Sequence, residues 1–245
     1  SKLRGMKTRM ARREFTAARV LGTVGVAHTY SSASPVTRPA AEAVDHIIIA
    51  FPDLDAGIEF VAAKTGIRPV PSGSHPGRGT RNALAALGGR RYLEVLALDP
   101  AQNVTNEMVT VVKSLAQPTI IGWAMASTDL AALRQNAAAA QLEPTEIMPG
   151  ARVTPSGKRL EWETVAFAKN TDGLLPFAIQ WKTPADHPST TAPAGITLVD
   201  LWFESPAPAP LKTSFEALGI AAKIDDAKAA RIRVRVTSAQ GEVEL

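Results

Sequence analysis

Residues 44–100 decide the fold, and they read VDHIIIAFPDLDAGIEFVAAKTGIRPVPSGSHPGRGTRNALAALGGRRYLEVLALDP. The segment opens with an apolar run at residues 46–51 and closes with another at residues 92–96, both of strand length and composition. Between them, residues 54–64 have the composition of a helix, with Asp53 as a suitable N-cap. A Gly-rich loop precedes the closing run. This order predicts one unit that consists of a strand, a helix and further strands.

The pattern of strand and helix recurs twice more along the chain, which indicates duplicated units. The second copy begins at residue 120 and the third at residue 196. We expect strands at residues 120–126, 158–168 and 175–181 and a helix at 129–141 in the second copy, and strands at 197–203, 231–236 and 242–245 and a helix at 211–218 in the third.

Two such units side by side predict one curved mixed sheet around a cavity, and the third, shorter unit would extend or cover an edge. The expected fold is therefore α+β, made of tandem units of a strand, a helix and further strands, with a partial third unit. The expected boundaries are an N-terminal extension at residues 1–43, paired modules at 44–195, and the partial module at 196–245. Short Pro-rich linkers separate the units.

Composition excludes several classes of function. The chain has 245 residues, with 45% hydrophobic and 20% charged, which fits a globular protein with a core. Aromatic residues make up 5%, which argues against a base-stacking platform for RNA. There is no cysteine, which excludes disulfides, thiolate metal sites and a Cys nucleophile. The sequence also lacks the G-x-S-x-G, P-loop and dinucleotide-binding motifs.

The excess of positive charge belongs to the N-terminal extension. The net charge is +4, but residues 1–43 carry eight Lys and Arg against two Glu, whereas the rest of the chain carries 19 basic and 21 acidic residues. The body of the protein therefore gives no electrostatic reason to expect a nucleic-acid partner.

Residues 1–43 have two interpretations, and both stay open. Basic residues come first, then a mildly apolar run at 16–27, then a stretch rich in Ser, Pro and Ala, which is the order of an export signal. Arg12-Arg13-Glu14-Phe15 resembles a twin-arginine signal, which would send the protein to the periplasm. The apolar run is too short to span a membrane. The alternative is a basic extension that packs on the domain or on a partner subunit of a cytoplasmic protein.

The residues between His46 and Glu94 resemble a known family. Ser74–Asn82 contains His75-Pro76-Gly77-x-Gly79-Thr80-x-Asn82, which is similar to the HPG-x-GT-x-N signature of the glyoxalase-like branch of the vicinal-oxygen-chelate superfamily. The resemblance runs from about residue 44 to 245 and is strongest at 45–100. It implies βαβββ modules whose opening His and closing Glu bind a metal inside a curved sheet.

His46 and Glu94 are the candidate metal ligands that this resemblance implies. Strand alternation puts His46, Ile48 and Ala50 on one face and Asp45, Ile47 and Ile49 on the other. A carboxylate in an apolar strand is costly to bury unless it is paired or bound to a metal. Imidazole and carboxylate together suit Zn, Fe(II), Mn, Ni or Co. The alternative is that Glu94 pairs with His46 or a buried Arg, with no metal.

The second module lacks the matching ligands. Alignment with the first module puts Gly122 opposite His46, and Gln180 opposite Glu94. The expected metal site is therefore degenerate, with His46, Glu94 and Gln180 as its ligands. His187, in the loop beyond, either reaches back toward the site or is an ordinary surface or capping residue.

The Gly-rich loop supplies the candidate catalytic and binding residues. His75 suits a general base or a ligand, and Asn82 a hydrogen-bond donor to substrate, so both are predicted as catalytic. Thr80 shares strand parity with Asn82, and Arg78 suits a substrate carboxylate. Trp162 and Trp181 are predicted to line the cavity. The alternative for the loop is a rigid turn with solvated arginines.

Two functional hypotheses remain open. The first is a metal-dependent enzyme of lyase, isomerase or dioxygenase type that acts on a small oxygen-rich substrate, because the resemblance implies a divalent metal as a Lewis acid. The second is a metal-free protein that binds or sequesters a small apolar or aromatic molecule. Fold alone does not decide between them. Members of the superfamily often pair subunits to complete a site, so a homodimer is also an expectation.

Overall fold

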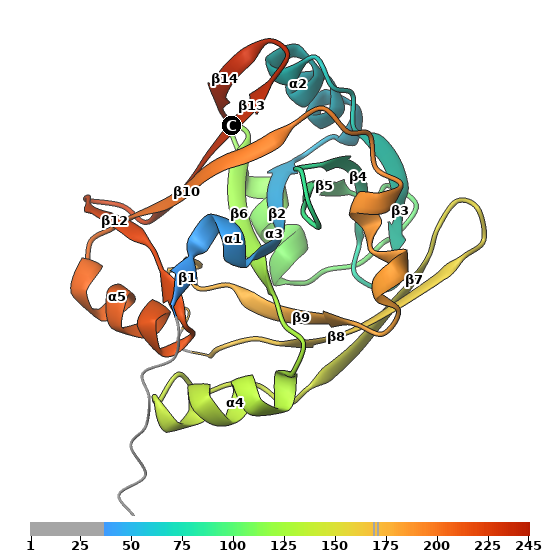
Figure 1. Cartoon of the computed structure of the whole chain (residues 1–245). Helices are drawn as coiled ribbons and strands as arrows, with labels where there is room; N and C mark the ends of the chain where they lie inside the picture. Colours follow the sequence, from blue (N-terminus) through green and yellow to red (C-terminus); the bar gives the residue numbers. More distant parts are fainter. Residues whose placement is uncertain (1–36, 169, 171) are drawn as a thin grey trace, which may run out of the picture. The chain divides into compact units, whose positions relative to one another are not determined.

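The computed structural model describes residues 37–168, 170 and 172–245 (Figure 1). Residues 1–36 of the predicted export signal, including its Arg12-Arg13 pair, lie outside these residues. In chain order the elements are β1 (Arg38–Pro39), α1 (Ala40–Ala43), β2 (Val44–Phe51), α2 (Leu54–Thr65), β3 (Val70–His75), β4 (Thr80–Ala86), β5 (Tyr92–Leu98), α3 (Glu107–Ser114), β6 (Thr119–Ala126), α4 (Leu130–Ala139), β7 (Met148–Val153), β8 (Arg159–Val165), β9 (Phe177–Trp181), η1 (Pro184–Asp186), η2 (Pro188–Thr190), β10 (Thr197–Ser205), α5 (Pro208–Ala217), β11 (Ile220–Ala221), β12 (Lys223–Asp226), β13 (Arg231–Ser238) and β14 (Gly241–Glu244).

The main sheet is built from two modules of the same topology. Its eight strands lie in the order β3-β4-β5-β2-β6-β9-β8-β7. The first strand of each module pairs in parallel with the last, β2 with β5 and β6 with β9, and the modules join where β2 and β6 pair antiparallel. The sheet curves until its edge strands β3 and β7 approach, where Arg152 Nη1 donates to Ser72 O at 2.7 Å. The predicted α+β fold of tandem βαβββ modules is confirmed.

Helix α2 forms where the sequence predicts it. The Asp53 carboxylate accepts from the Ala56 backbone N–H at 2.9 Å and caps the first turn, and Gly66 ends the helix with a φ of 74°. The helix buries Leu54, Ile58 and Val61 against the outer face of the sheet. Capping and one apolar face thus determine both its limits and its position.

The third segment forms a separate sheet beside the first module. Its strands lie in the order β12-β10-β13-β14, and β10 pairs in parallel with β12, which follows helix α5 and the short strand β11. The element order therefore repeats that of the first two modules, but the pairing does not. Trp123 of the main sheet contacts Phe203 and Phe215 of this segment, so the core continues between them. Figure 1 shows β13 and β14 next to α2.

Two short segments cover the inner face of the main sheet. Val112 of α3 packs against Leu96 on that face, and Ala192, just after η2, packs against a second apolar cluster there. Neither segment was expected as an element from the sequence. None of the helices in the described part of the chain is long and apolar enough to cross a bilayer.

A β-bulge at Asp45 changes which side chains face inward. In the pairing of β2 with β6, Val44 lies opposite Met125 and His46 opposite Ala124, so Asp45 has no partner of its own. A bulged residue leaves the alternation of the strand. Asp45 therefore lies on the same side as His46, within 2.8 Å of its ring, and the prediction that strand alternation separates the two is wrong.

Gly57 tests the packing of α2 on the sheet. A Cβ at this position would lie 2.6 Å from Val95 Cγ1 and 2.7 Å from Phe51 Cδ2. We expect Gly57→Ala to destabilise the protein by about 1–2 kcal/mol, since overpacking exceeds the gain in helix propensity. Urea unfolding followed by circular dichroism measures this. Gly122→Ala, whose Cβ meets no heavy atom within 4 Å, is the control, and equal stability of the two variants would contradict the packing.

Candidate functional site

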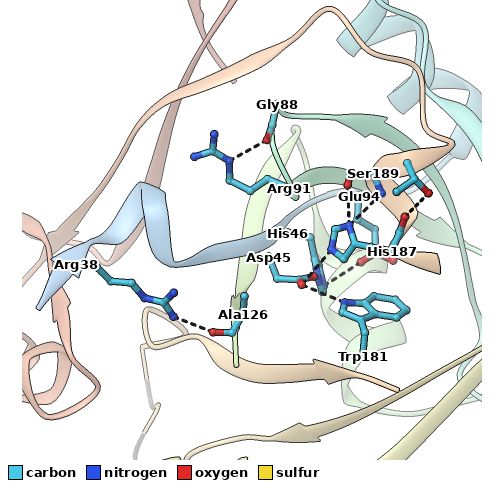
Figure 2. Close-up of polar contacts among 11 residues, drawn as sticks. Arg38, Asp45, His46, Gly88, Arg91, Glu94, Ala126, Trp181, His187 and Ser189 are labelled. Atoms are coloured by element: carbon cyan, nitrogen blue, oxygen red, sulfur yellow. Dashed lines mark hydrogen bonds and ion pairs between the residues drawn. The ribbon is translucent and has the colours of Figure 1, made fainter. Parts of the chain in front are cut away.

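Three N–H donors converge on the buried carboxylate of Asp45 (Figure 2). His46 Nδ1 lies 2.8 Å from Oδ1, and Trp181 Nε1 and His187 Nε2 lie 3.0 and 3.1 Å from Oδ2. The three come from β2, β9 and the η1–η2 segment. His187 is completely buried, and its ring contacts that of Trp181 edge to face. The sequence left His187 between two interpretations, and the structure assigns it to Asp45.

These contacts fix the tautomers of both imidazoles. The Ser189 backbone N–H and hydroxyl both reach His187 Nδ1, at 3.3 and 2.7 Å, so Nδ1 accepts and Nε2 carries the hydrogen that Asp45 receives. For His46 the carboxylate receives the hydrogen of Nδ1, which leaves Nε2 to face the sheet interior. The His46 ring also stacks on Tyr92, with centroids 4.6 Å apart, so its orientation is set from two sides.

Asp45 is ionised at neutral pH. Burial opposes its charge, but the hydrogen bonds from His187 and His46 outweigh burial and lower the pKa of Asp45 to about 2. A carboxylate that accepts from an imidazole stabilises the protonated form of that imidazole and holds its orientation.

Glu94 lies in the interior opposite His46. Asn82 Nδ2 donates to its Oε1 at 2.7 Å. His46 Nε2 lies 3.8 Å from Oε2, and His75 Nε2 lies 3.6 Å from Oε1. Both separations are too long for a direct hydrogen bond. A gap of this length between two polar atoms suits a bridging water or a polar group of a ligand.

A chain of hydrogen bonds holds Asn82 in place. His75 Nε2 accepts from Asn82 Nδ2 at 3.2 Å, and His75 Nδ1 pairs with Thr80 Oγ1 at 2.9 Å. Burial, helped by the charges of Arg152 and Arg78 and opposed by that of Glu94, lowers the pKa of His75, which favours the neutral ring. Asn82 Oδ1 is buried and has no hydrogen-bond partner in the described part of the chain.

Arg152 and Tyr92 complete the polar interior. Arg152 lies on β7 opposite Leu160, an inward-facing residue of β8, and is 6% exposed. Burial lowers the pKa of Arg152, while Tyr92 and Glu94 act to raise it, so the guanidinium shares its surroundings with both. Burial, together with the charges of Asp45 and Glu94, raises the pKa of Tyr92 well above its usual value.

The second module contributes apolar side chains to the same interior. Ala124, the cross-strand neighbour of His46, pairs with Phe177, and Ile179 follows on the same face of β9. Trp162 and Trp181 contact each other there, with centroids 5.3 Å apart. Phe177 meets the His46 ring edge to face at 5.4 Å. The polar half of the interior thus faces an aromatic and aliphatic half.

Gln180 and Arg78 are not brought to this cluster. Gln180 Oε1 accepts from the Leu130 backbone N–H at 3.1 Å, at the start of α4. Gln180 neighbours the inward-facing Trp181 on β9, and alternation turns it to the opposite face. Arg78 is exposed in the turn between β3 and β4. The structure therefore leaves both Gln180 and Arg78 outside the buried cluster.

The residues present do not make the metal centre that the resemblance implies. A protein metal site takes at least three well-placed ligands. Among the residues that the structure describes, no group of three or more His, Asp or Glu is arranged to hold a metal ion. The Asn82 NH₂ group, which cannot ligate, bonds both His75 and Glu94, and the second module offers only Ala124 and Ile179.

A cavity of about 1040 Å³ opens beside this cluster. Asp45 and Trp181 line it, together with Arg38 and Arg91, whereas His46 and Glu94 do not. Arg38 donates to the Ala126 carbonyl and Arg91 to the Gly88 carbonyl, as Figure 2 shows. Since His46 Nε2 and Glu94 face each other inside the sheet, we place the candidate site there rather than in this cavity.

The low pKa of Asp45 predicts how stability depends on pH. The folded-state pKa of about 2 lies below the ordinary value of 3.8, so the ionised group stabilises the fold above pH 4, and this contribution falls away between pH 4 and pH 2. Its size is about 2 kcal/mol. Urea unfolding should show that Asp45→Asn loses less stability than wild type over this range. Asp226→Asn, at an exposed position, is the control, and parallel curves for Asp45→Asn and wild type would contradict the role of the carboxylate.

Solved structures are similar to this chain, and one of them supports the fold. A hypothetical protein from Staphylococcus aureus matches with a TM-score of 0.65 and 16% identity, covering 81% of this chain and 92% of that one. Methylmalonyl-CoA epimerases match at 20% identity. The Mycobacterium tuberculosis enzyme has a TM-score of 0.40 and covers 58% of this chain and 90% of that one. A Streptomyces coelicolor variant in complex with 2-nitronate-propionyl-CoA has a TM-score of 0.43, with coverages of 60% and 99%.

Sequence comparison assigns the family. No curated protein matches the chain significantly. The family model described as the glyoxalase-like domain matches residues 44–219, which include both modules and the start of the third segment. The predicted resemblance is confirmed, and the chain belongs to the glyoxalase-like domain family of the vicinal-oxygen-chelate superfamily.

Proposed function

We propose that the protein is an enzyme that moves a proton at a carbon atom next to a carbonyl group of a small substrate. Glu94 and His46 are the acid–base pair of this proposal. The observation that carries it is the facing of His46 Nε2 and Glu94 Oε2 across 3.8 Å inside the sheet, with Asp45 behind His46. A carboxylate and an imidazole this close can act on neighbouring atoms of one substrate that lies beside them, the carboxylate on a carbon and the imidazole on its carbonyl oxygen.

The reaction balances with these two residues alone. Glu94 takes the proton from the carbon, the electrons of the C–H bond form a C=C bond, and the carbonyl π electrons move to the oxygen. His46, when protonated, donates from Nε2 to that oxygen, and Asp45 stabilises the imidazolium before the transfer. Return of the proton to the opposite face of the same carbon inverts its configuration, while the oxygen gives its proton back to His46 and the carbonyl re-forms. Alternatively, the enolate re-forms the carbonyl and expels a leaving group, with its electron pair, from the next carbon, which is an elimination.

His75, Asn82 and Thr80 support this pair as positioning residues. Asn82 orients the base through its 2.7 Å bond to Glu94 Oε1, and His75 fixes the Asn82 amide because its Nε2 accepts from the same NH₂ group. Thr80 in turn fixes the His75 ring. The sequence predicted His75 and Asn82 as catalytic residues, and we assign them instead to the orientation of Glu94.

A binding role without turnover is the second candidate function. The observation that favours it is the apolar cluster on the inner face, which includes Ala124, Ile179 and Trp181 of the second module. Trp162 and Trp181 supply aromatic surface for an apolar or aromatic group. A binding protein would retain its ligand in variants of Glu94 and show no exchange of protons in any form.

Proton exchange with solvent tests the enzyme even though its product is unidentified. The protein is incubated in D₂O with 2-oxo acids, α-hydroxy ketones and 2-substituted malonates, and ¹H NMR follows the loss of the C–H signal. We expect exchange with at least one class, and a rate at least about 100-fold lower in Glu94→Gln, because the base is lost. Glu161→Gln, exposed on β8, is the matched control. Exchange at the wild-type rate in Glu94→Gln would sink the assignment.

Metal removal tests whether the reaction depends on an ion. We expect the exchange rate to be unchanged by a chelator, because the donors described around Glu94 do not form a metal site. Elemental mass spectrometry should find well below one metal per chain after incubation with Zn, Fe(II), Mn, Ni or Co. About one metal per chain, absent in His46→Ala, would instead support the metal-dependent hypothesis that the resemblance implies.

A further inference from the structure

We propose that Arg152 binds a carboxylate group of the substrate inside the curved sheet, so that the natural ligand is a small monoanionic acid. The inference rests on the proposed function for the reacting pair, but it concerns a different group and a different interaction. Neither the family signature nor the acid–base pair gives a role to the buried guanidinium of Arg152.

Among the residues that the structure describes, Arg152 is a buried cation without an anionic partner. It is 6% exposed, and it donates from Nη1 to the Ser72 carbonyl at 2.7 Å. No carboxylate oxygen of the described residues lies within 4 Å of it. The nearby carboxylates of Asp45 and Glu94 make their ion pairs with histidines instead. Burial of an unpaired charge is costly, so an arginine held in this way indicates an anion that arrives from outside the chain.

The guanidinium faces the same interior as the reacting pair. Its cross-strand neighbour is Leu160, which packs with Tyr92 and Trp181 on the inner face. Its Nη1 lies 3.9 Å from where a Cβ of Gly73 would be, and Gly73 pairs across the sheet with Asn82, which donates to Glu94. An anion bound to Arg152 is therefore near Glu94, with the rest of the ligand between the acid–base pair and the two tryptophans.

The charge of the interior favours a monoanion. Two carboxylates, Asp45 and Glu94, already lie there with one guanidinium, Arg152. A carboxylate brings one negative charge, which the guanidinium matches with two parallel N–H bonds. A phosphate monoester brings close to two negative charges. Arg152 would match only one of them, and the other would be repelled by the carboxylate of Glu94. We therefore choose a carboxylate over a phosphate.

Matched acids and amides test this proposal directly. The full chain is titrated with pairs of increasing size, from glycolate and glycolamide to phenylacetate and phenylacetamide, and with inorganic phosphate, and saturation-transfer NMR measures binding. We expect at least one acid to bind at least about tenfold more tightly than its amide, the loss typical of a removed charge-assisted contact. Equal binding of every acid and its amide, no binding of any acid, or tighter binding of phosphate than of the acids would overturn the proposal.

Variants separate ligand binding from a structural role. Arg152→Gln should bind the acid at least about tenfold more weakly, Arg152→Lys should recover part of the affinity, and Arg159→Gln, which removes an exposed arginine of β8, should match wild type. The melting temperature of wild type should rise with the acid, and that of Arg152→Gln should not. Undiminished acid binding in Arg152→Gln would show that Arg152 only joins β7 to β3.

The same measurements distinguish failure of this inference from failure of the proposed function. Glu94→Gln should lose proton exchange and keep the difference between acid and amide, because its side chain is not the anion site. Acid binding that depends on Arg152 without any proton exchange in wild type would leave this inference standing and remove the enzyme assignment. Proton exchange with acids that is unaffected in Arg152→Gln would leave the enzyme assignment standing and remove this inference.

Discussion

The carboxylate of Asp45 is the constraint on which the interior depends. Its two oxygens receive hydrogen bonds from His46, Trp181 and His187, and so join β2, β9 and the segment that covers the inner face. A buried charge is tolerated only when donors replace the lost water, and three N–H groups do so here. Without this carboxylate, His187 would keep a buried N–H unpaired and His46 would lose the group that fixes its tautomer.

The bulge in β2 is what makes this arrangement possible. A regular strand would turn Asp45 to the outer face, into the apolar core where Ile47 and Ile49 pack. One extra residue in the pairing with β6 brings Asp45 to the side of His46 instead. The local irregularity thus converts two neighbouring residues of one strand into a carboxylate–imidazole pair, which strand periodicity alone forbids.

The two modules share a topology but divide the chemistry between them. The first contributes His46, Glu94 and Asn82, whereas the equivalent strands of the second contribute Ala124 and Ile179. A symmetric sheet therefore encloses an asymmetric interior, in which the acid–base residues come from the first module and Arg152 of β7 is the buried charged residue that the structure describes in the second. Such a division suits a ligand with a reactive polar end and an apolar remainder.

Much of the fold follows from local sequence. The apolar runs, the Asp53 cap and Gly66 predict β2, β5 and α2 to within a few residues, because periodicity and capping act locally. Strand β7 was not predicted, since its sequence opens with Met148-Pro149-Gly150 and lacks the apolar alternation of a strand. With β7 missing, Arg152 could not be placed inward. The bulge at Asp45 depends on pairing between distant strands, which sequence periodicity does not encode.

Charge balance connects the acid–base pair to the anion site. The described interior holds the carboxylates of Asp45 and Glu94 and the guanidinium of Arg152. A carboxylate bound to Arg152 would supply the anion that this guanidinium lacks among the described residues. The same ligand would then be held at one end by a charge-assisted contact, while Glu94 and His46 act on its other atoms. Binding energy from the carboxylate would therefore serve to position the reacting carbon as well as to hold the ligand.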